Sequence, residues 1–262
     1  MNGDAEDRAW QPVLAIRARA ERGERAAADA APAPLDALFG ELAATPPGGR
    51  FVVAHLGQSL DGRIATESGH SHYIGCDQSL LHLHRLRALV DAVVVGVGTV
   101  VADAPRLTTR HCTGPDPVRV VLDPRARLGA DASIVRDRAA PTLVVHSRDV
   151  HPRLPDHVAT AALAPDPTGA LPPAGVLAVL AERGLTRVLV EGGGRTVSSF
   201  VAARVLDRLQ FAVAPLLIGS GRPALSLPVV ETLDAALRPP YRRFDLGPDT
   251  LFDFDLRVDA TA

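Results

Sequence analysis

RVLVEGGGRTVSSFVAARV, residues 187–205, changes character twice along its length. Residues 187–190 read Arg-Val-Leu-Val, a short apolar run after one arginine that is typical of a buried strand, and residues 196–205 have the spacing of a helix. Three consecutive glycines between them are costly in unfolded-state entropy unless the backbone must approach something closely. Pyrophosphate is the ligand that suits such a loop, with a tight strand–helix turn as the alternative. The stretch therefore predicts one strand–loop–helix unit of an α/β fold.

The same alternation of strands and helices extends over the chain from residue 50 onward. Continuous apolar strands separated by helices indicate a mostly parallel sheet that is buried on both faces. The stretch at 251–258 alternates as an edge strand would, and the Pro-rich stretch at 151–173 is interpreted as a surface excursion. We expect further strands at 51–57, 92–97, 119–122, 142–146 and 210–217, and helices at 80–89 and 177–183.

Residues 1–49 differ from the rest of the chain and are assigned to an N-terminal helical extension, with the catalytic domain at 50–262. Residues 13–31 are rich in Ala, Arg and Glu, which favours an exposed or amphipathic helix, and a second short helix is expected at 35–44. The extension is interpreted as a solvated tail or a dimer-packing arm, outside the functional site.

Composition excludes several function classes. All 28 basic residues are arginine, so a Walker A loop and a pyridoxal-phosphate Schiff base are ruled out. The net charge of −2 points to neither nucleic acid nor an anionic membrane as partner. Cys76 and Cys112 are expected to be free thiols, no metal-ligand spacing is found, and the polar N-terminus lacks a signal-peptide core. We expect a cytoplasmic protein without a metal.

Candidate site residues follow the strands, because ligands of open α/β sheets gather at the carboxyl ends of strands. The loop at 57–63 sets Asp61 between glycines, although alone it could be a turn. The loop at 96–103 resembles a dinucleotide-binding loop but lacks its last glycine. Arg87, Arg106 and Arg110 suit an oxyanion, and His55 could be a proton donor or a packed polar residue.

Five stretches carry a family resemblance: SLDGRIATESGHSHYI (59–74), LHRLRALVDAVVVGVGTVVADAPRLTTR (83–110), RVVLD (119–123), LVEGGGRTVSSFVAARVLDRL (189–209) and APLLIGSGRPAL (214–225). In this order they resemble the reductase domain of the bifunctional riboflavin-biosynthesis deaminase–reductase. The resemblance implies a dihydrofolate-reductase-like fold, with antiparallel C-terminal strands following the parallel sheet. The zinc-binding motifs of the deaminase half are missing, so we expect a stand-alone reductase.

The resemblance also implies a reaction and a set of residues. The reaction is the NADPH-dependent reduction of 5-amino-6-(5-phosphoribosylamino)uracil, a phosphoribosyl pyrimidine, by hydride transfer to ribose C1′. A homodimer is implied as well, with the C-terminal strands as its interface. The resemblance assigns the cofactor to Gly57, Tyr73, Thr99, Asp103, Gly192, Gly193, Gly194, Arg195 and Thr196, and the substrate to Ser71, Arg87, Leu107, Arg110 and Glu191.

Three positions depart from the family pattern. His55 stands where a lysine is common, Ala104 replaces a second acid, and Pro124 replaces a small hydroxyl residue near the cofactor's 2′-phosphate, for which Arg125 could compensate. The catalytic proton source stays open between Glu191, His55, Asp61 and water. The alternatives are a paralogous NAD(P)H reductase of dihydrofolate or a related pterin or pyrimidine, and a non-catalytic nucleotide-binding homologue.

Overall fold

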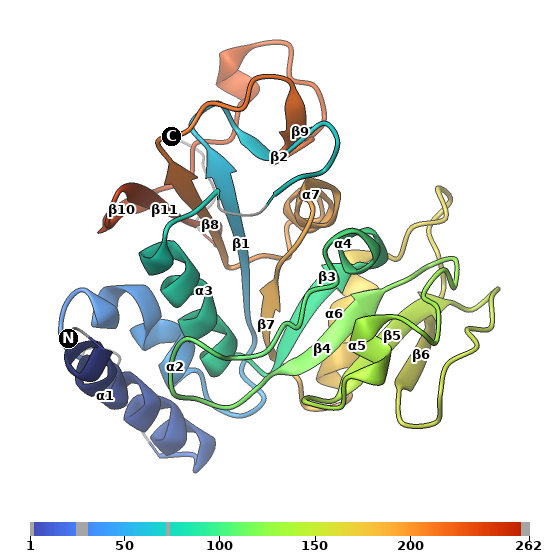
Figure 1. Ribbon diagram of the computed structural model, residues 1–262, viewed down its shortest axis with the longest axis horizontal. Coiled ribbons are helices and arrows are strands. Elements are labelled where there is room, and N and C mark those ends of the chain that lie inside the picture. The colour runs from blue at the N-terminus through green and yellow to red at the C-terminus, as the bar shows by residue number, and fades with distance from the viewer. Residues whose placement is uncertain (1–2, 25–30, 72–73, 258–262) are drawn as a thin grey trace.

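The computed structural model describes residues 3–24, 31–71 and 74–257, which fold around one large sheet (Figure 1). Its nine strands are β1 Phe51–Ser59, β3 Ala92–Gly96, β4 Val118–Leu122, β5 Thr142–Ser147, β6 Ala159–Leu163, β7 Arg187–Val190, β8 Arg208–Ala214, β10 Tyr241–Leu246 and β11 Asp249–Asp255. They lie in the order β10-β11-β8-β1-β7-β3-β4-β5-β6. β2 Arg63–Thr66 and β9 Gly221–Pro223 pair antiparallel in a small second sheet.

Strand direction divides the large sheet into two parts. Every pairing from β8 across β1, β7, β3, β4 and β5 to β6 is parallel. At the other edge β11 pairs antiparallel with both β8 and β10. The carboxyl ends of the parallel strands therefore meet at one edge, and the loops that follow them are neighbours.

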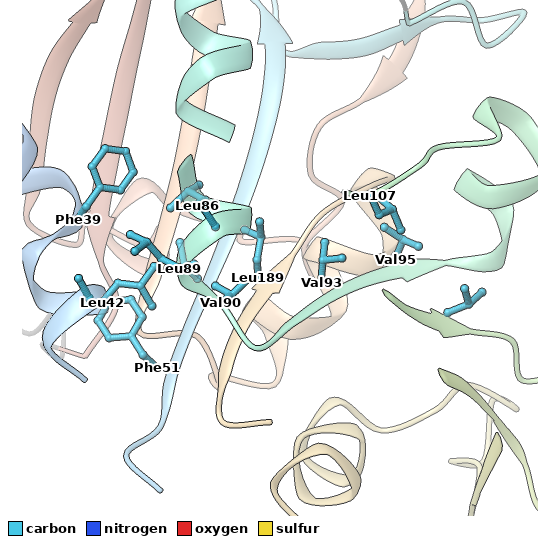
Figure 2. Close-up of a cluster of buried hydrophobic side chains, with 14 of the residues drawn as sticks. Phe39, Leu42, Phe51, Leu86, Leu89, Val90, Val93, Val95, Leu107 and Leu189 are labelled. Atoms are coloured by element: carbon cyan, nitrogen blue, oxygen red, sulfur yellow. The ribbon is translucent and has the colours of Figure 1, made fainter. Parts of the chain in front are cut away.

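Both faces of the parallel strands are covered by helices, which explains their continuous apolar runs. Successive residues of a strand point to opposite faces, so Val53 and Val93 belong to one buried cluster, and Val52 and Val94 to the other. The first cluster packs under α3 Asp77–Leu89, α4 Val97–Asp103 and α5 Ser133–Arg136 (Figure 2). The second packs under α6 Pro173–Ala181 and α7 Gly194–Ala202.

The N-terminal extension is part of the packed molecule. It comprises α1 Gly3–Glu21, a π-helical turn η2 Asp36–Gly40 and α2 Glu41–Ala44. Trp10, Val13 and Phe39 are buried in the same apolar cluster as Leu86 and Leu89 of α3. The interpretation of this segment as a solvated tail is therefore wrong, because its apolar side chains fill the core beside α3. The helix expected at 13–31 begins ten residues earlier, at Gly3, and ends at Glu21, so its expected bounds are wrong. Residues 25–30 lie outside the described residues.

Most of the expected elements are confirmed with small shifts at their ends, including the strands at 51–57, 92–97, 119–122, 142–146 and 187–190. Two expectations are wrong. The stretch at 151–173 contains β6, which forms one edge of the large sheet. The stretch at 251–258 holds β11, which is not an edge strand because β10 pairs on its outer side. Residue 258 itself lies outside the described part of the chain.

Within residues 3–24, 31–71 and 74–257, no helix has both the length and the apolar character that a membrane span needs.

Candidate active site

A cleft of about 1520 Å³ opens at the carboxyl ends of the parallel strands. β1 contributes His55 and Gly57 to its lining, and the glycine loop contributes residues 191–196 after β7. The ends of β3 and β4 lie beside them with Thr99 and Pro124. The cleft therefore lies where the topology of an α/β sheet places a ligand.

A buried ion pair lies in the wall of the cleft. Arg87 of α3 donates from Nε to Oε1 of Glu191 at 2.7 Å and from Nη2 to Oε2 at 2.6 Å. Glu191 directly follows β7, and its backbone N–H donates to the Val94 carbonyl oxygen at 2.9 Å, which fixes its direction. Burial lowers the pKa of Arg87, but the charge and hydrogen bonds of Glu191 outweigh burial and raise it. The Arg87 guanidinium therefore stays charged at neutral pH.

This pair changes the interpretation of Arg87. The sequence suggested that Arg87 would bind the substrate's phosphate, but two of its nitrogens bind Glu191 and its Nη1 donates to the Thr108 carbonyl oxygen at 3.2 Å. The geometry instead lets Arg87 neutralise and orient Glu191. The remaining lone pairs of that carboxylate can accept hydrogen bonds from a hydroxyl or a ring N–H.

His55 is buried and lines the same cleft. Its Nδ1 has no hydrogen-bond partner among the residues that the structure describes. Burial, together with His82 and Arg87, lowers the pKa of His55 to about 3, although Gln210 acts in the opposite direction. His55 is therefore a neutral imidazole near pH 7, able to donate or accept one hydrogen bond, and cannot replace the positive charge of a lysine.

The glycine loop after β7 owes part of its sequence to packing within the chain. Gly192 has a φ of +111°, which a side chain would strain, and a Cβ on Gly194 would come within 2.5 Å of the Pro223 carbonyl oxygen. The Gly193 N–H donates to Thr99 Oγ1 at 3.0 Å, which joins this loop to α4. Gly192 and Gly194 are thus required by the fold itself, while the N-terminus of α7 still suits a pyrophosphate.

Two other glycines in the cleft have no such internal reason. A Cβ on Gly57 or Gly98 would meet no atom of the described residues within 4 Å, and neither residue has a positive φ. Both residues line the cleft. Their missing side chains leave open space against bare backbone, which a flat ligand ring can approach closely.

The loop at 104–117, between α4 and β4, carries the remaining arginines. Arg110 is exposed, and its Nη1 donates to Thr108 Oγ1 at 3.0 Å. Burial lowers the pKa of Arg110, and the positive charges of Arg87 and Arg106 lower it further. Arg110 does not contribute to the cleft lining of the described residues. A cluster of positive charges beside the cleft is nevertheless suited to a phosphate.

Asp61 lies apart from the cleft. Its carboxylate accepts hydrogen bonds from the Ser59 hydroxyl at 2.5 Å and from the backbone N–H groups of Ile218 and Gly219 at 3.2 and 2.6 Å. These bonds lower the pKa of Asp61 to about 2. At neutral pH the side chain is deprotonated and holds two loops together, so it has no proton to give.

The structure brings most of the suggested residues together. Among the residues suggested by the sequence, those that line the cleft are His55, Gly57, Ser71, Arg87, Thr99, Asp103, Leu107, Glu191, Gly192, Gly193, Gly194, Arg195 and Thr196. Tyr73 lies outside the described residues. Reasoning from the sequence missed Arg127, Arg222 and the 168–171 segment, which also line the cleft. Arg127 follows β4, so its place near the carboxyl end of that strand could have indicated it. Arg222 lies in β9, far along the chain from the strands whose ends form the cleft, so no local signal indicates it.

The described residues hold no group of three or more His, Cys, Asp or Glu side chains that could bind a metal ion. The positions that depart from the family pattern also have clear places. Pro124 lies in the cleft lining with Arg125 and Arg127, and Ala104 ends α4 with a φ of +43°.

Comparison with known proteins identifies the family and supports the fold. A family model described as the RibD C-terminal domain matches residues 50–238. The chain belongs to this family. The RibD C-terminal domain family comprises reductases of riboflavin biosynthesis with a dihydrofolate-reductase-like fold, as the sequence predicted.

Individual relatives agree with this membership. The chain is 36% identical over 182 residues to a 2,5-diamino-6-ribosylamino-4(3H)-pyrimidinone 5′-phosphate reductase of Archaeoglobus fulgidus, covering 64% of this chain and 82% of that protein. It is 35% identical over 209 residues to RibD of Bacillus amyloliquefaciens, covering 76% of this chain and 55% of RibD. The chain thus spans about half the length of that RibD relative.

A solved structure supports the fold. The crystal structure of the Thermotoga maritima diaminohydroxyphosphoribosylaminopyrimidine deaminase/5-amino-6-(5-phosphoribosylamino)uracil reductase matches with a TM-score of 0.67 and 28% identity. The match covers 79% of this chain and 56% of that one.

Proposed function

We propose that this chain reduces 5-amino-6-(5-phosphoribosylamino)uracil with NADPH, converting the ribosyl group to ribityl. The observation that carries the proposal is the cleft itself, in which the buried Arg87–Glu191 pair and the open glycines Gly57 and Gly98 line one space. The polar pair suits a sugar–pyrimidine substrate, and the bare backbone suits a flat cofactor ring. Family membership supports reductase chemistry at this place.

The cofactor half of the cleft fits a nicotinamide dinucleotide. Gly57 and Gly98 leave room for a ring, and the N-terminus of α7 suits the pyrophosphate. Arg125 and Arg127 line the cleft after β4 and can meet a 2′-phosphate in place of the hydroxyl that Pro124 lacks. We therefore propose NADPH over NADH.

When bound, the nicotinamide supplies a hydride to C1′ of the opened ribosylamine. Residues of the chain bind and orient the substrate that receives this hydride. Glu191, fixed by Arg87, accepts hydrogen bonds from the substrate, and neutral His55 can make one further hydrogen bond to it. Reduction of a carbon–nitrogen double bond also needs one proton at nitrogen. Asp61 is ionised and lies away from the cleft lining, and both oxygens of Glu191 accept hydrogen bonds from Arg87, which leaves water and the neutral imidazole of His55 as its sources.

A second substrate is favoured by one comparison. The chain covers 82% of the Archaeoglobus fulgidus reductase, whose name specifies the diaminopyrimidinone ribosyl phosphate, but 55% of Bacillus RibD. The two substrates differ at C2 of the ring, where one has an amino group and the other an oxo group. The same cleft residues would bind either ribose phosphate.

Oxidation of NADPH at 340 nm tests the proposal. The purified chain is given each of the two pyrimidine phosphates, with dihydrofolate and NADH in parallel. We expect faster NADPH oxidation with 5-amino-6-(5-phosphoribosylamino)uracil than with the diaminopyrimidinone or dihydrofolate, and slower oxidation when NADH replaces NADPH. Preferred turnover of the diaminopyrimidinone would move the chain to the second substrate. Turnover of dihydrofolate alone would point to a paralogous reductase, and cofactor binding without any turnover would indicate a non-catalytic homologue.

Arg110→Ala tests the phosphate side. Loss of a charge-assisted bond to phosphate is expected to raise KM for the ribosyl phosphate about tenfold. Arg183→Ala is the matched control, because Arg183 is exposed at the end of α6 on the other face of the sheet. An unchanged KM in Arg110→Ala would argue against a phosphate at this loop.

We also propose that the chain forms a homodimer through its C-terminal region. Exposed large apolar side chains gather between β8 and the start of β10: Leu216, Leu217, Leu227, Val229, Val230, Leu233, Leu237 and Tyr241. Apolar side chains grouped along one segment in this way are typical of a contact surface.

A further inference from the structure

The N-terminal segment, residues 3–24 and 31–49, reaches the substrate side of the cleft along two lines of contact. Both lines begin in the buried aromatic pair Trp10 and Phe39, whose ring centroids lie 5.3 Å apart in an edge-to-face arrangement. Figure 2 shows Phe39 beside Leu86 and Leu89 of α3, the helix that carries Arg87. The segment therefore packs directly against an element of the site.

The first line runs to the 104–117 loop. The Trp10 indole N–H donates to the Thr113 carbonyl oxygen at 2.8 Å, and the Thr113 hydroxyl donates to Asp7 at 2.8 Å. Arg85 of α3 lies 5.3 Å over the Trp10 ring. α1 thus holds the loop from one side at Thr113, a few residues beyond Arg110.

The same loop is held from its other side by α3. The backbone N–H of Arg110 donates to His84 Nδ1 at 2.9 Å, and Arg87 donates to the Thr108 carbonyl oxygen at 3.2 Å. A Cβ on Gly114 would collide with the side chain of Ala88. The loop is therefore clamped between α1 and α3, and its path depends on both helices.

The second line runs through the core to the cleft wall. Phe39 packs on His82 with ring centroids 5.1 Å apart, and His82 packs on His55 at 5.4 Å. His82 is held in turn by a 2.8 Å hydrogen bond between its Nε2 and the Gln210 side-chain oxygen. His55 lines the cleft, so the aromatic column Trp10–Phe39–His82–His55 joins the N-terminal segment to the site.

We infer that the N-terminal segment is a positioning element for the substrate half of the cleft, acting through Thr113 on the 104–117 loop and through His82 on His55. This inference rests on the proposed function in one respect, that the Arg87–Arg110 side takes the phosphoribosyl pyrimidine. The described residues of the segment do not line the cleft, and the contribution of the segment is to fix two elements that do.

Trp10→Phe and Trp10→Ala separate this role from stability alone. Trp10→Phe keeps an aromatic ring in the core and removes the bond to Thr113, so KM for the pyrimidine phosphate is expected to rise about fivefold while the Kd of NADPH stays within about twofold. Trp10→Ala also breaks the aromatic column and is expected to raise KM further. Leu180→Ala on α6 is the control, because it removes a fully buried side chain on the opposite face of the sheet.

The control is expected to lower Tm with KM and Kd unchanged. A wild-type KM in folded Trp10→Phe, or an equal rise in KM and in the Kd of NADPH, would overturn the inference. Failure of the proposed function would look different, since the wild-type chain itself would then reduce neither pyrimidine.

A second readout is independent of turnover. Trp10 is the single tryptophan of the chain, so its fluorescence reports on this contact alone. Ribose 5-phosphate is expected to change the fluorescence emission of Trp10. NADP⁺ does not absorb at the wavelengths of tryptophan emission and is expected to leave that emission unchanged. A response to NADP⁺ as large as that to ribose 5-phosphate would contradict a role confined to the substrate half.

Discussion

Gly98 lies in the first turn of α4, where alanine would ordinarily be the better helix residue. Nothing in the described part of the chain would touch its Cβ. We therefore expect Gly98→Ala to leave Tm equal to or above that of the wild type and yet to weaken NADPH binding about tenfold, because the methyl group would occupy ligand space. Thermal unfolding and titration of NADPH fluorescence measure the two effects.

Gly96→Ala is the comparison for that substitution. A Cβ on Gly96 would lie 2.7 Å from Thr196 Oγ1, so this variant is expected to lose stability as well as affinity. Unchanged NADPH affinity in Gly98→Ala would show that the open space beside it is not the cofactor site.

The Arg87–Glu191 pair makes a second prediction at the level of single residues. Glu191→Leu leaves a buried guanidinium without its partner and is expected to lower the free energy of unfolding by about 3 kcal/mol. The double variant Arg87→Leu/Glu191→Leu removes both charges and is expected to recover most of that loss. NADPH oxidation is expected to be abolished in both variants, since both lack the Glu191 carboxylate that accepts hydrogen bonds from the substrate. Urea unfolding together with NADPH oxidation separates the two quantities, and recovered activity in the double variant would contradict a role in substrate binding.

Three buried histidines make stability depend on pH. Burial, as the largest cause, lowers the pKa of His55 and His84 to about 3 and of His82 to about 4. The unfolded chain binds these protons near the ordinary value of about 6.5, so between that pH and about 4 it holds more protons than the folded chain. Stability is therefore present above pH 6.5 and is expected to fall as pH falls below it.

Urea unfolding at pH 7.5 and 5.5 measures this loss. His82→Phe removes one of the titrating groups and is expected to show a smaller difference between the two pH values. An identical pH dependence in the variant and the wild type would show that His82 is not buried as a neutral group.

At the scale of elements, the attachment of α7 depends on Gly194. A Cβ there would lie within 2.5 Å of the Pro223 carbonyl oxygen, and the neighbouring backbone cannot move as a flexible side chain would. Gly194→Ala is expected to lower the free energy of unfolding by about 2 kcal/mol, in the range of strained core substitutions. Chemical denaturation measures it, with Gly57→Ala as the matched control that should stay near wild type. A neutral Gly194→Ala would mean that α7 does not approach β9 this closely.

The elements also show how much of the fold could be read from the sequence. β1, β3, β4, β5 and β7 were predictable because each is a continuous apolar run buried under helices on both faces. β6 and β10 were missed because edge strands bury less and show weaker patterns. The register between strands far apart in the chain has no local signal at all.

The same distinction holds for the site. The glycine loop and its place after β7 were predictable from one stretch, whereas the reason for Gly194 depends on Pro223, which packs on it from a distant loop. The pairing of Arg87 with Glu191 joins residues 104 positions apart, and only the packed sheet and α3 bring them together. The contact of Trp10 with the 104–117 loop was hidden for the same reason, because Trp10 and Thr113 are 103 positions apart in the chain.

At the scale of the whole molecule, the exposed apolar side chains after β8 predict self-association. Val229→Asp and Leu233→Asp place charges among them and are expected to convert a dimer to a monomer with the fold retained. Light scattering after size-exclusion chromatography measures the mass. A monomeric wild-type chain at micromolar concentration would contradict the proposed homodimer.

We propose that the cleft at the carboxyl ends of β1, β3 and β7 reduces a phosphoribosyl pyrimidine with NADPH. The decisive measurement is NADPH oxidation by the purified chain with freshly prepared 5-amino-6-(5-phosphoribosylamino)uracil, with Arg87→Leu/Glu191→Leu as the inactive control. The wild type is expected to turn over this substrate, and the double variant is expected to show no turnover. Equal rates in the two proteins, or no oxidation of NADPH by the wild type with either pyrimidine phosphate, would contradict it.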